Sequence, residues 1–286
     1  MCLSYISKPI CIIAIYFMVV FPHCKINLGL DIISKREDGY HAIDTVFYPV
    51  SWTDVLEIIP SHQLLFTSSG AIIPGKEEDN LCLKAYHLIR KDFDIGPVNI
   101  HLHKIIPTGA GLGGGSSDAA YTLRVLNEIF ELQLDKERLQ NYASRIGSDC
   151  AFFIQNEPMR GSGRGEVLQP VSIHLKGKYM VIIKPEVHVS TAEAYAGVVP
   201  QIPSASLLDT VQSPIEKWGL YLKNDFEKTV LSHHPAIARL KEQLYSMKAV
   251  YASMSGSGSS VFGIFNEEIK TDAAWERLAH WSGWLL

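Results

Sequence analysis

Cysteine is scarce in this 286-residue sequence, and no two cysteines follow the C-x-x-C spacing. The five cysteines are odd in number and widely scattered, so neither a disulfide scaffold nor a cysteine zinc site is predicted. A reducing, cytoplasmic compartment is the expected location. An excess of basic charge is also missing, because 26 basic residues stand against 30 acidic ones. That balance argues against a general nucleic-acid-binding surface.

Long apolar runs are nearly absent, and the one exception extends from Ile10 to Phe21. It is too short for a membrane-spanning helix, which needs about 20 apolar residues. Lys8 lies just upstream, as in a signal peptide, but no small-x-small cleavage site follows. We therefore favour the alternative that Val19 to Phe21 begin the first strand. Residues 1–17 are then an extra segment outside the fold, and no membrane association is expected.

The composition is that of an ordinary globular protein, with 47% hydrophobic and 20% charged residues. It excludes a disordered chain and a collagen-like repeat, and the length fits one large or two ordinary domains. Predicted strands come in clusters separated by helices rather than in regular alternation with them. This order favours an α+β fold over a doubly wound sheet.

Strict alternation with period two is visible from Cys24 onward. Apolar residues from Ile26 to Ile32 point to one side, and Lys25 and Asn27 point to the other, which predicts a half-buried strand with a polar face. The Asp38-Gly39 pair predicts a tight turn into further strands. The front third of the chain is thus predicted to form an antiparallel sheet.

A segment dense in glycine, from Pro107 to Ser117, is the strongest local signal. It lies between a predicted strand, Val98 to Ile106, and a helix predicted to begin near Ser117. Glycines let backbone N–H groups approach a ligand closely, and a helix N-terminus attracts anions. The segment therefore predicts a phosphate-binding loop, in preference to a merely flexible connection.

Two well-known phosphate motifs do not explain this loop. Gly109, Gly111 and Gly114 satisfy G-x-G-x-x-G, but two predicted helices follow instead of the strand and acidic residue of a dinucleotide-binding fold. A Walker A loop needs a lysine after its glycines, and this loop has none. The phosphate loop is therefore of another class.

The loop resembles the P-x-G-x-G-L-G-x-x-S-S motif of the GHMP kinases, and Ser253 to Ser260 resembles their C-terminal glycine motif. Lys25 to Leu28, Asp38 to His41 and Gly147 to Asp149 resemble further signatures of the family. The resemblance implies a two-domain α+β fold with the active site between the domains. It also implies a left-handed βαβ unit in an N-terminal domain of residues 18–165 and a ferredoxin-like C-terminal domain of residues 166–286.

The same resemblance implies an ATP- and Mg²⁺-dependent kinase of the non-mevalonate isoprenoid route, whose substrate is a small cytidine-diphosphate-linked polyol. Lys25 and Asp149 would be catalytic, although on the residues alone Lys25 fits a solvated strand face and Asp149 a helix cap. The implied substrate-binding residues are Asn27, Tyr40, His41 and Tyr195. The implied ATP-binding residues are Pro107, Thr108, Gly109, Ala110, Gly111, Leu112, Gly113, Gly114, Gly115, Ser116 and Ser117. A monomer or weak homodimer is expected.

Several alternatives stay open at this point. Another GHMP kinase, of the homoserine or mevalonate type, is disfavoured by the segment from Asp38 to His41. A non-catalytic nucleotide-binding regulator is disfavoured by the presence of both Lys25 and Asp149. Asn80 fits either a residue near adenine or a helix cap. His101 and His103 share a strand face, but no third ligand at a credible spacing joins them, so a metal site there is not predicted.

Overall fold

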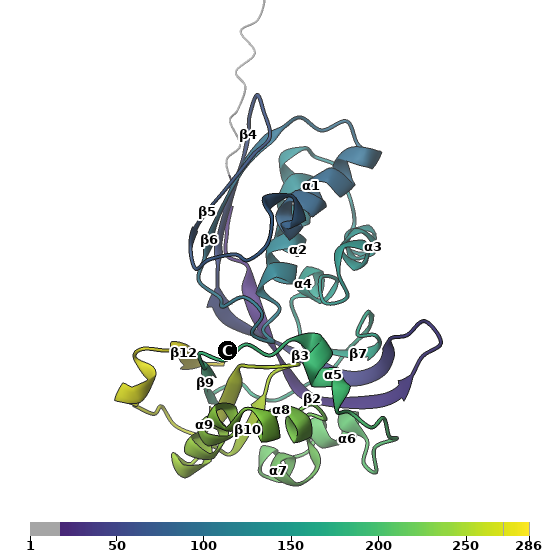
Figure 1. Cartoon of the computed structure of the whole chain (residues 1–286). Coiled ribbons are helices and arrows are strands. Elements are labelled where there is room, and N and C mark those ends of the chain that lie inside the picture. Colours follow the sequence, from purple (N-terminus) through teal and green to yellow (C-terminus); the bar gives the residue numbers. More distant parts are fainter. Residues whose placement is uncertain (1–17, 271, 286) are drawn as a thin grey trace, which may run out of the picture.

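The structure, a computed structural model, describes residues 18–270 and 272–285, so the predicted extra segment 1–17 lies outside the described residues. Two lobes lie one above the other, and two long strands run between them (Figure 1). The described elements fall into three four-stranded sheets with helices packed on them. This arrangement agrees with the predicted α+β class.

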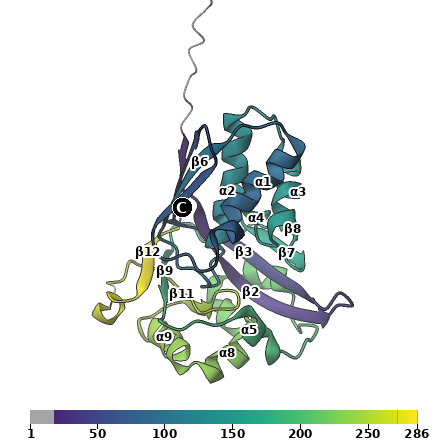
Figure 2. The ribbon, with the colours of Figure 1, turned by 45° about the horizontal axis from the view of Figure 1, so that its top comes forward.

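The upper lobe contains a mixed sheet in the order β1-β4-β6-β5, in which only β5 and β6 are parallel. Its strands are β1 (Met18–Val20), β4 (Val55–Pro60), β5 (Leu65–Gly70) and β6 (Val98–Lys104). Helices cover one side of this sheet, as both ribbon views show (Figures 1 and 2). They are η1 (Glu77–Asp79), α1 (Leu81–Asp92), α2 (Gly114–Ile129), α3 (Lys136–Ile146) and α4 (Phe152–Gln155).

The middle sheet is antiparallel in the order β2-β3-β7-β8. Its strands are β2 (His23–Lys35), β3 (His41–Thr53), β7 (Met159–Gly163) and β8 (Val167–Pro170). The predicted Asp38-Gly39 turn joins β2 to β3, and Gly39 has φ +84°, which is why glycine suits that position. The strands β1 to β4 pair in antiparallel fashion as predicted, but they divide between two sheets, and β5, also in the front third, pairs in parallel with β6.

The lower lobe holds an antiparallel sheet in the order β10-β11-β9-β12. Its strands are β9 (Tyr179–Lys184), β10 (Tyr251–Met254), β11 (Val261–Phe265) and β12 (Ala279–Trp284). The lobe's helices are α5 (Thr191–Ala196), α6 (Leu207–Gln212), η2 (Ile215–Lys217), α7 (Trp218–Tyr221), α8 (Glu227–His233), α9 (Pro235–Ser246) and η3 (Ala273–Trp275). Within the described ranges, no helix is both long and apolar enough to cross a membrane.

Strand β2 shows the predicted alternation, but its polar face is not exposed to water. Ile26 and Leu28 are fully buried in the core between the middle and lower sheets. Lys25 and Asn27, on the other face, are only 4% and 2% exposed. The prediction of a half-buried strand is therefore wrong at this end of β2. Burial of a lysine and an asparagine requires polar partners, and these lie in the candidate site.

Helix starts follow the predicted caps closely. Asp135 accepts a hydrogen bond from the Arg138 N–H at 2.8 Å and opens α3, which ends just before Gly147 as expected. Ser190 accepts a hydrogen bond from the Glu193 N–H at 3.1 Å and opens α5. Only half of the predicted capping box forms here, because the Glu193 carboxylate instead pairs with His234 Nε2 at 2.7 Å.

Candidate active site

The predicted phosphate loop connects β6 to α2, and its backbone is shaped by glycine. Gly109, Gly111 and Gly113 have φ values of +61°, +77° and +70°. A Cβ atom at Gly111 would lie 2.0 Å from the Ser255 carbonyl oxygen, so no other residue fits there. The glycines therefore permit both the left-handed backbone and the close approach of a second loop.

Helix α2 begins at Gly114, three residues earlier than the predicted start near Ser117. Its N-cap, Gly113, has no side chain to accept hydrogen bonds from the first turn. The N–H groups of the first turn and the positive end of the helix dipole therefore face the loop. No side-chain oxygen caps these N–H groups. This is a suitable place for phosphate oxygens.

The second glycine-rich loop, residues 255–260, packs against the first. Ser255 Oγ donates a hydrogen bond to the Gly111 carbonyl oxygen at 2.9 Å, and the Ser260 N–H donates to the Ala110 carbonyl oxygen at 3.2 Å. Two motifs that are far apart in the sequence therefore form one backbone structure at the junction of the lobes.

Lys25 projects from β2 under the first loop. Its Nζ atom donates hydrogen bonds to Asn27 Oδ1 at 2.6 Å and to the Gly111 carbonyl oxygen at 3.2 Å. It also lies 3.4 Å from Asp149 Oδ2. The structure thus brings together the two predicted catalytic side chains, and the buried cation finds its polar partners here.

Asp149 lies in the turn between α3 and α4 and is one-third exposed. The alternative of a helix cap is not supported, because α4 has Ala151 as its N-cap and no side-chain capping hydrogen bond. The Asp149 carboxylate contacts Lys25 on one side and lines a cavity on the other. A carboxylate so placed can accept a proton from a bound hydroxyl group.

Asn27 is fixed by a short chain of hydrogen bonds. Its Oδ1 atom accepts from Lys25, and its Nδ2 atom donates to Thr45 Oγ1 at 2.8 Å. The Thr45 hydroxyl in turn donates to the Gly29 carbonyl oxygen at 2.6 Å. Asn27 lines the cavity, as a substrate-binding residue must, but its contacts here also orient Lys25.

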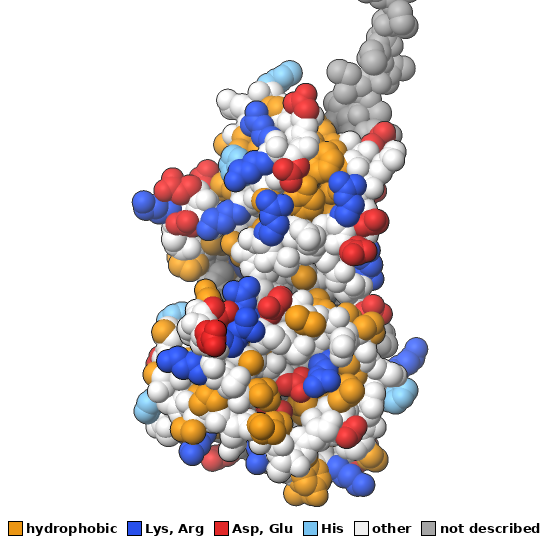
Figure 3. Space-filling model, turned by 90° about the vertical axis from the view of Figure 1, so that its right-hand side faces the viewer, with side chains coloured by type: hydrophobic (Ala, Val, Ile, Leu, Met, Phe, Trp, Pro, Cys, Tyr) orange, Lys and Arg blue, Asp and Glu red, His pale blue; other side chains and the backbone are white. Residues whose placement is uncertain are grey.

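The cavity next to these groups has a volume of about 700 Å³ and lies between the lobes. Its lining includes Lys25, Asn27, Asp149, Tyr195 and the loop residues from Pro107 to Ser116, except Leu112. The space-filling view shows the molecule narrowing at this level, with acidic and basic side chains side by side (Figure 3). A cavity of this size accommodates a ligand as large as a nucleotide.

Of the predicted substrate-binding aromatics, Tyr195 lines this cavity, and Tyr40 and His41 lie close by but outside its lining. The His41 and Tyr195 rings stack with centroids 4.7 Å apart and planes 21° from parallel, and Phe226 meets the edge of Tyr195. Tyr195 and Phe226 line the cavity, whereas His41 stands behind Tyr195. Tyr40 is 58% exposed on the β2–β3 turn, with the Arg164 guanidinium 5.0 Å above its ring.

Arg164, His188 and Phe226 are among the residues of the cavity wall that sequence reasoning missed. Arg164 stands in the glycine-rich turn of residues 160–166, which is visible in the sequence. A charged residue in such a turn could have been singled out as a candidate site residue. His188 lies against the first loop, with its Cε1 atom 3.2 Å from the position of a Cβ at Gly109. For His188 and Phe226 no local pattern reveals the site, because only the fold brings them there.

A second, smaller cavity of about 350 Å³ opens on the other side of the phosphate loop. Thr108 and Gly115 line both cavities, and Asn80 lines this one. The Asn80 side chain also accepts a hydrogen bond from the Cys82 N–H at 2.9 Å. Asn80 is therefore the predicted cap of α1, and the same residue borders a cavity beside the loop.

A buried trio of charges, Asp54, Lys104 and Asp118, was not foreseen, and Lys104 and Asp118 line the smaller cavity. Lys104 Nζ donates to both carboxylates, and Asp54 also accepts from the backbone N–H groups of residues 105 and 106. Burial lowers the pKa of Lys104, but the two carboxylates outweigh it and raise that pKa overall. Burial raises the pKa of Asp118 to about 7 against the opposing effect of Lys104.

No group of three or more histidine, cysteine or acidic side chains that could hold a metal ion occurs in residues 18–270 and 272–285. His101 and His103 lie within hydrogen-bonding distance of strand hydroxyls instead, His101 Nδ1 at 2.8 Å from Thr67 Oγ1 and His103 Nδ1 at 2.9 Å from Ser69 Oγ. Both histidines therefore have hydrogen-bond partners on the neighbouring strand β5.

Comparisons with known families and proteins agree with this site. The family model described as "GHMP kinases N terminal domain" matches residues 80–157, and "GHMP kinases C terminal" matches residues 208–282. A 4-diphosphocytidyl-2-C-methyl-D-erythritol kinase of Cytophaga hutchinsonii is 51% identical over 255 residues, which are 89% of this chain and 94% of the relative. The enzyme of the same name from Bacteroides thetaiotaomicron is 50% identical over 88% of this chain and 93% of its own length.

Solved structures give the same result. A crystal structure of a 4-(cytidine 5'-diphospho)-2C-methyl-D-erythritol kinase superposes with a TM-score of 0.72 at 31% identity, over 86% of this chain and 90% of the other. A homoserine kinase from Cytophaga hutchinsonii has a TM-score of 0.65 at 17% identity over 88% of each chain, which shows the shared fold alone. With two family models matched in order and relatives of about half identical sequence along nearly their full length, this chain belongs to the GHMP kinases.

Proposed function

We propose that this chain transfers the γ-phosphoryl group of ATP to the 2-hydroxyl of 4-diphosphocytidyl-2-C-methyl-D-erythritol in non-mevalonate isoprenoid biosynthesis. The observation that carries this proposal is the contact between Lys25 and Asp149 under a glycine loop, in a cavity between the lobes. The names and similarity of the relatives support the choice of substrate. The direct test is release of ADP that requires both ATP and this cytidyl substrate.

Each group at the junction of the lobes has a role in this reaction. The open side of Asp149 accepts the proton of the substrate hydroxyl as its oxygen attacks the γ-phosphorus. Lys25 is a fixed cation beside the reacting oxygens and offsets the negative charge there. The N–H groups at the start of α2 hold the phosphate oxygens of ATP. Enclosure between the lobes holds ATP and the substrate hydroxyl close together and in the orientation that the transfer requires.

We propose that Mg²⁺ arrives with ATP. Mg²⁺ is commonly bound by phosphate oxygens with one or two carboxylates and several waters, rather than in a dedicated protein cage. The absence of a metal-binding cluster among the described residues, with Asp149 as the one acidic side chain on the cavity wall, fits that mode. Asp149 and Ser116 offer oxygen atoms there, and the ion neutralises charge on the phosphates.

The smaller cavity is proposed to hold the adenine end of ATP. It adjoins the phosphate loop through Thr108 and Gly115, so a nucleotide whose phosphates lie on the loop can extend into it. Asn80 and Asp118 lie in its wall and offer polar atoms to a base. In this arrangement the larger cavity is left for the cytidyl substrate.

The cytosine of the substrate is proposed to bind among Tyr40, His41 and Tyr195. The His41 and Tyr195 rings now stack directly on each other at 4.7 Å. In the proposed arrangement Tyr40 stacks on the base, His41 forms hydrogen bonds with its edge and Tyr195 closes over it, so the base takes the place next to His41 that the Tyr195 ring now occupies. Substrate binding at this position therefore requires Tyr195 on α5 to separate from His41 on β3.

A variant of the base site gives the first prediction. We expect His41→Ala to raise the KM for the cytidyl substrate by about tenfold or more while the KM for ATP changes little. The reason is that removal of the His41 imidazole leaves the polar edge of the bound cytosine without its hydrogen-bond partner. Both constants are measured in a coupled ADP assay, with the exposed His62→Ala as control. Equal turnover of the uridine analogue by the unmodified enzyme would contradict the assignment.

Arg164 is proposed to bind the diphosphate of the cytidyl substrate. It lines the cavity near Tyr40, and its Nε atom lies 3.7 Å from Glu166 Oε1. We expect Arg164→Met to raise the KM for this substrate by about tenfold, as for the loss of one charge-assisted hydrogen bond. The salt dependence of kcat/KM should weaken at the same time. Arg36→Met, on the β2–β3 turn and outside the cavity lining, serves as control, and an equal effect of both variants would refute the role.

Two finer features of the fold are also proposals. The parallel pair β5 and β6 with α1 between them is the proposed left-handed βαβ unit. The antiparallel order β10-β11-β9-β12 supports a ferredoxin-like C-terminal domain in which η3 replaces one helix. We keep the proposed domain boundary between residues 165 and 166, because the two family models match on either side of it.

A further inference from the structure

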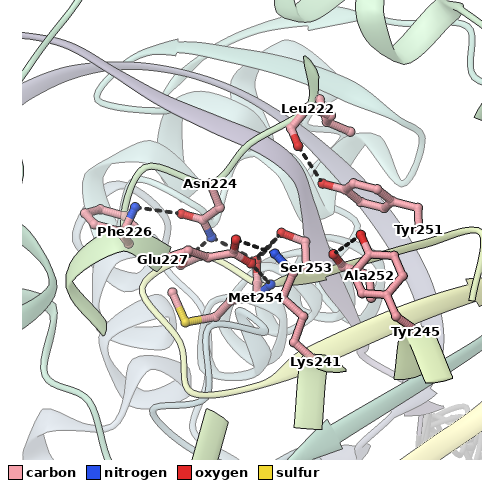
Figure 4. Close-up of polar contacts among 11 residues, drawn as sticks. Leu222, Asn224, Phe226, Glu227, Lys241, Tyr245, Tyr251, Ala252, Ser253 and Met254 are labelled. Carbon is pink, nitrogen blue, oxygen red and sulfur yellow. Dashed lines mark hydrogen bonds and ion pairs between the residues drawn. The ribbon is translucent and has the colours of Figure 1, made fainter. Parts of the chain in front are cut away.

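A four-residue segment, Asn224 to Glu227, runs from the loop after α7 into the first residue of α8 and connects three parts of the site that lie far apart in the sequence. Its side chains contact β2, the end of β10 and the aromatic end of the cavity. The segment carries none of the motifs by which the site was predicted. Figure 4 shows Asn224 and Glu227 converging on Ser253 and Met254, where β10 leads into the second glycine loop.

Asn224 uses its whole amide group. It is 3% exposed, and its Nδ2 atom donates to the carbonyl oxygens of Met254 and Gly256, both at 2.8 Å. Its Oδ1 atom accepts from the Phe226 N–H at 3.1 Å. Two carbonyl groups at the entrance of the glycine loop are thus held by a single side chain.

Glu227 holds the same stretch of backbone from another direction. Its Oε1 atom accepts from the Met254 N–H at 2.7 Å and from Ser253 Oγ at 3.0 Å. Its Oε2 atom accepts from Lys241 Nζ at 2.5 Å, which ties α8 to α9. Both polar groups of the Met254 backbone are therefore satisfied by side chains of this segment.

Asp225 attaches the segment to β2, and Phe226 attaches it to the aromatic end of the cavity. Asp225 Oδ2 accepts from the Ile32 N–H at 2.7 Å, and its own N–H donates to the Leu30 carbonyl oxygen at 2.9 Å, so the segment is attached to β2. Phe226 lines the cavity and meets the edge of Tyr195. The segment thus contacts both the strand that carries Lys25 and the aromatic end of the site.

The second loop needs such support, because residues 255–260 are only glycine and serine and have no large side chains of their own to pack. The second glycine loop contributes to the site only while its backbone stays packed against Gly111 and the cavity. Ser255 Oγ donates to the carbonyl oxygen of Gly111, and that oxygen also accepts from Lys25 Nζ. Gly256 borders the cavity beside Asn27. A shift of the loop therefore displaces the group that orients Lys25.

We infer that Asn224 and Glu227 are positioning residues for phosphoryl transfer. They hold the second glycine loop against Gly111, and the loop fixes Lys25 beside Asp149. This inference rests on the proposed function, since it takes Lys25 and Asp149 as the reacting pair. It goes beyond that function by assigning a role to a segment outside both glycine motifs.

The test is Asn224→Asp, which keeps size and the acceptor for the Phe226 N–H but removes both donated hydrogen bonds. We expect kcat to fall about 30-fold, because a small misplacement of catalytic groups can cost as much as 100-fold. The KM for ATP should change less than about threefold, since the start of α2 is not touched. Hydrogen exchange in a peptide spanning residues 254–261 should become faster.

The matched control is Asn127→Asp. Asn127 makes the same kind of amide pairing, donating to the Leu134 carbonyl oxygen at 3.1 Å and accepting from the Leu134 N–H at 2.9 Å, but it lies outside both cavities. It should lose a similar amount of thermal stability and keep its kcat. Equal losses of kcat in the two variants would overturn the inference. Glu227→Gln, which retains an acceptor for Met254, replaces Asn224→Asp if the latter does not fold.

A double variant distinguishes positioning of Lys25 through the loop from a general loss of structural stability. Ser255→Ala removes the next link in the same chain, the hydrogen bond to Gly111. If Asn224 acts through this loop, Asn224→Asp with Ser255→Ala should lose little more kcat than the worse single variant. Fully additive losses would overturn the inference. Failure of the wild-type chain to use the cytidyl substrate would instead refute the proposed substrate, and the same kcat ratios would then be measured with the alcohol that it does phosphorylate.

Discussion

Replacing Asp149 by asparagine is expected to lower kcat by about 10²–10⁴, or about 3–5 kcal/mol of barrier. The amide keeps the size of the carboxylate and an oxygen toward Lys25, 3.4 Å away in the native site. It cannot accept the proton of the substrate hydroxyl. Stability and ATP affinity should change little, because Asp149 caps no helix. A coupled ADP assay and a thermal melt measure the two effects.

Asp92→Asn is the matched control, since Asp92 also pairs with a basic side chain, Arg145 at 3.8 Å, but lies outside both cavities. It should retain full turnover. Lys25→Ala should also lower kcat, and the double variant with Asp149→Asn should lose much less than the product of the two single losses. Near-normal turnover by Asp149→Asn would place the general base elsewhere.

The largest expected loss of stability comes from Lys104→Met. Removal of this lysine leaves the buried carboxylates of Asp54 and Asp118 without their cation. Breaking a buried ion pair on one side typically costs about 3–5 kcal/mol of unfolding free energy. Urea unfolding measures that loss, and Lys184→Met is the control. Lys184 is half-buried but donates only to two backbone carbonyl oxygens, so its loss should cost about 1 kcal/mol.

The loss of unfolding free energy in Lys104→Met should depend on pH. The pKa of Asp118 is about 7 in the folded chain, and Lys104 opposes an even higher value. A carboxyl group whose pKa is raised on folding stabilises the folded state below its unfolded pKa of about 3.9, and this contribution is lost as pH rises through the folded pKa. Without Lys104 the folded pKa rises further, so the variant should be less impaired at pH 5 than at pH 8. A deficit equal at both pH values would show that Asp118 is not responsible.

Local patterns predicted the elements of this fold well, because each depends on neighbouring residues. The alternation from Cys24, the Asp38-Gly39 turn and the Asp135 cap each specify structure within a few residues. The start of α2 was placed at Ser117 instead of Gly114, since glycine disfavours helix by intrinsic propensity. In the structure a Cβ at Gly114 would lie 2.9 Å from both Ile106 Cγ2 and Lys104 Nζ, so tertiary packing, which propensity does not report, favours glycine in this first turn.

The site was only partly predictable for a related reason. The family motifs led to Lys25 and Asp149, and the fold brings them within 3.4 Å. No spacing along the chain connects Asp54 with Lys104, or Asn224 with Met254. Such buried polar contacts arise from the tertiary fold, where each group must find a partner away from water.

The central claim, that this chain is an ATP-dependent kinase for a cytidyl polyol, is tested most directly by product analysis. The purified chain is incubated with Mg²⁺, ATP and a panel of alcohols that includes 4-diphosphocytidyl-2-C-methyl-D-erythritol, its uridine analogue, homoserine and mevalonate. The account predicts one ADP for each cytidyl substrate consumed, with the new phosphate on the 2-hydroxyl, and much slower turnover of the other three. Preferred phosphorylation of homoserine or mevalonate, or ADP release without any phosphorylated alcohol, would contradict it.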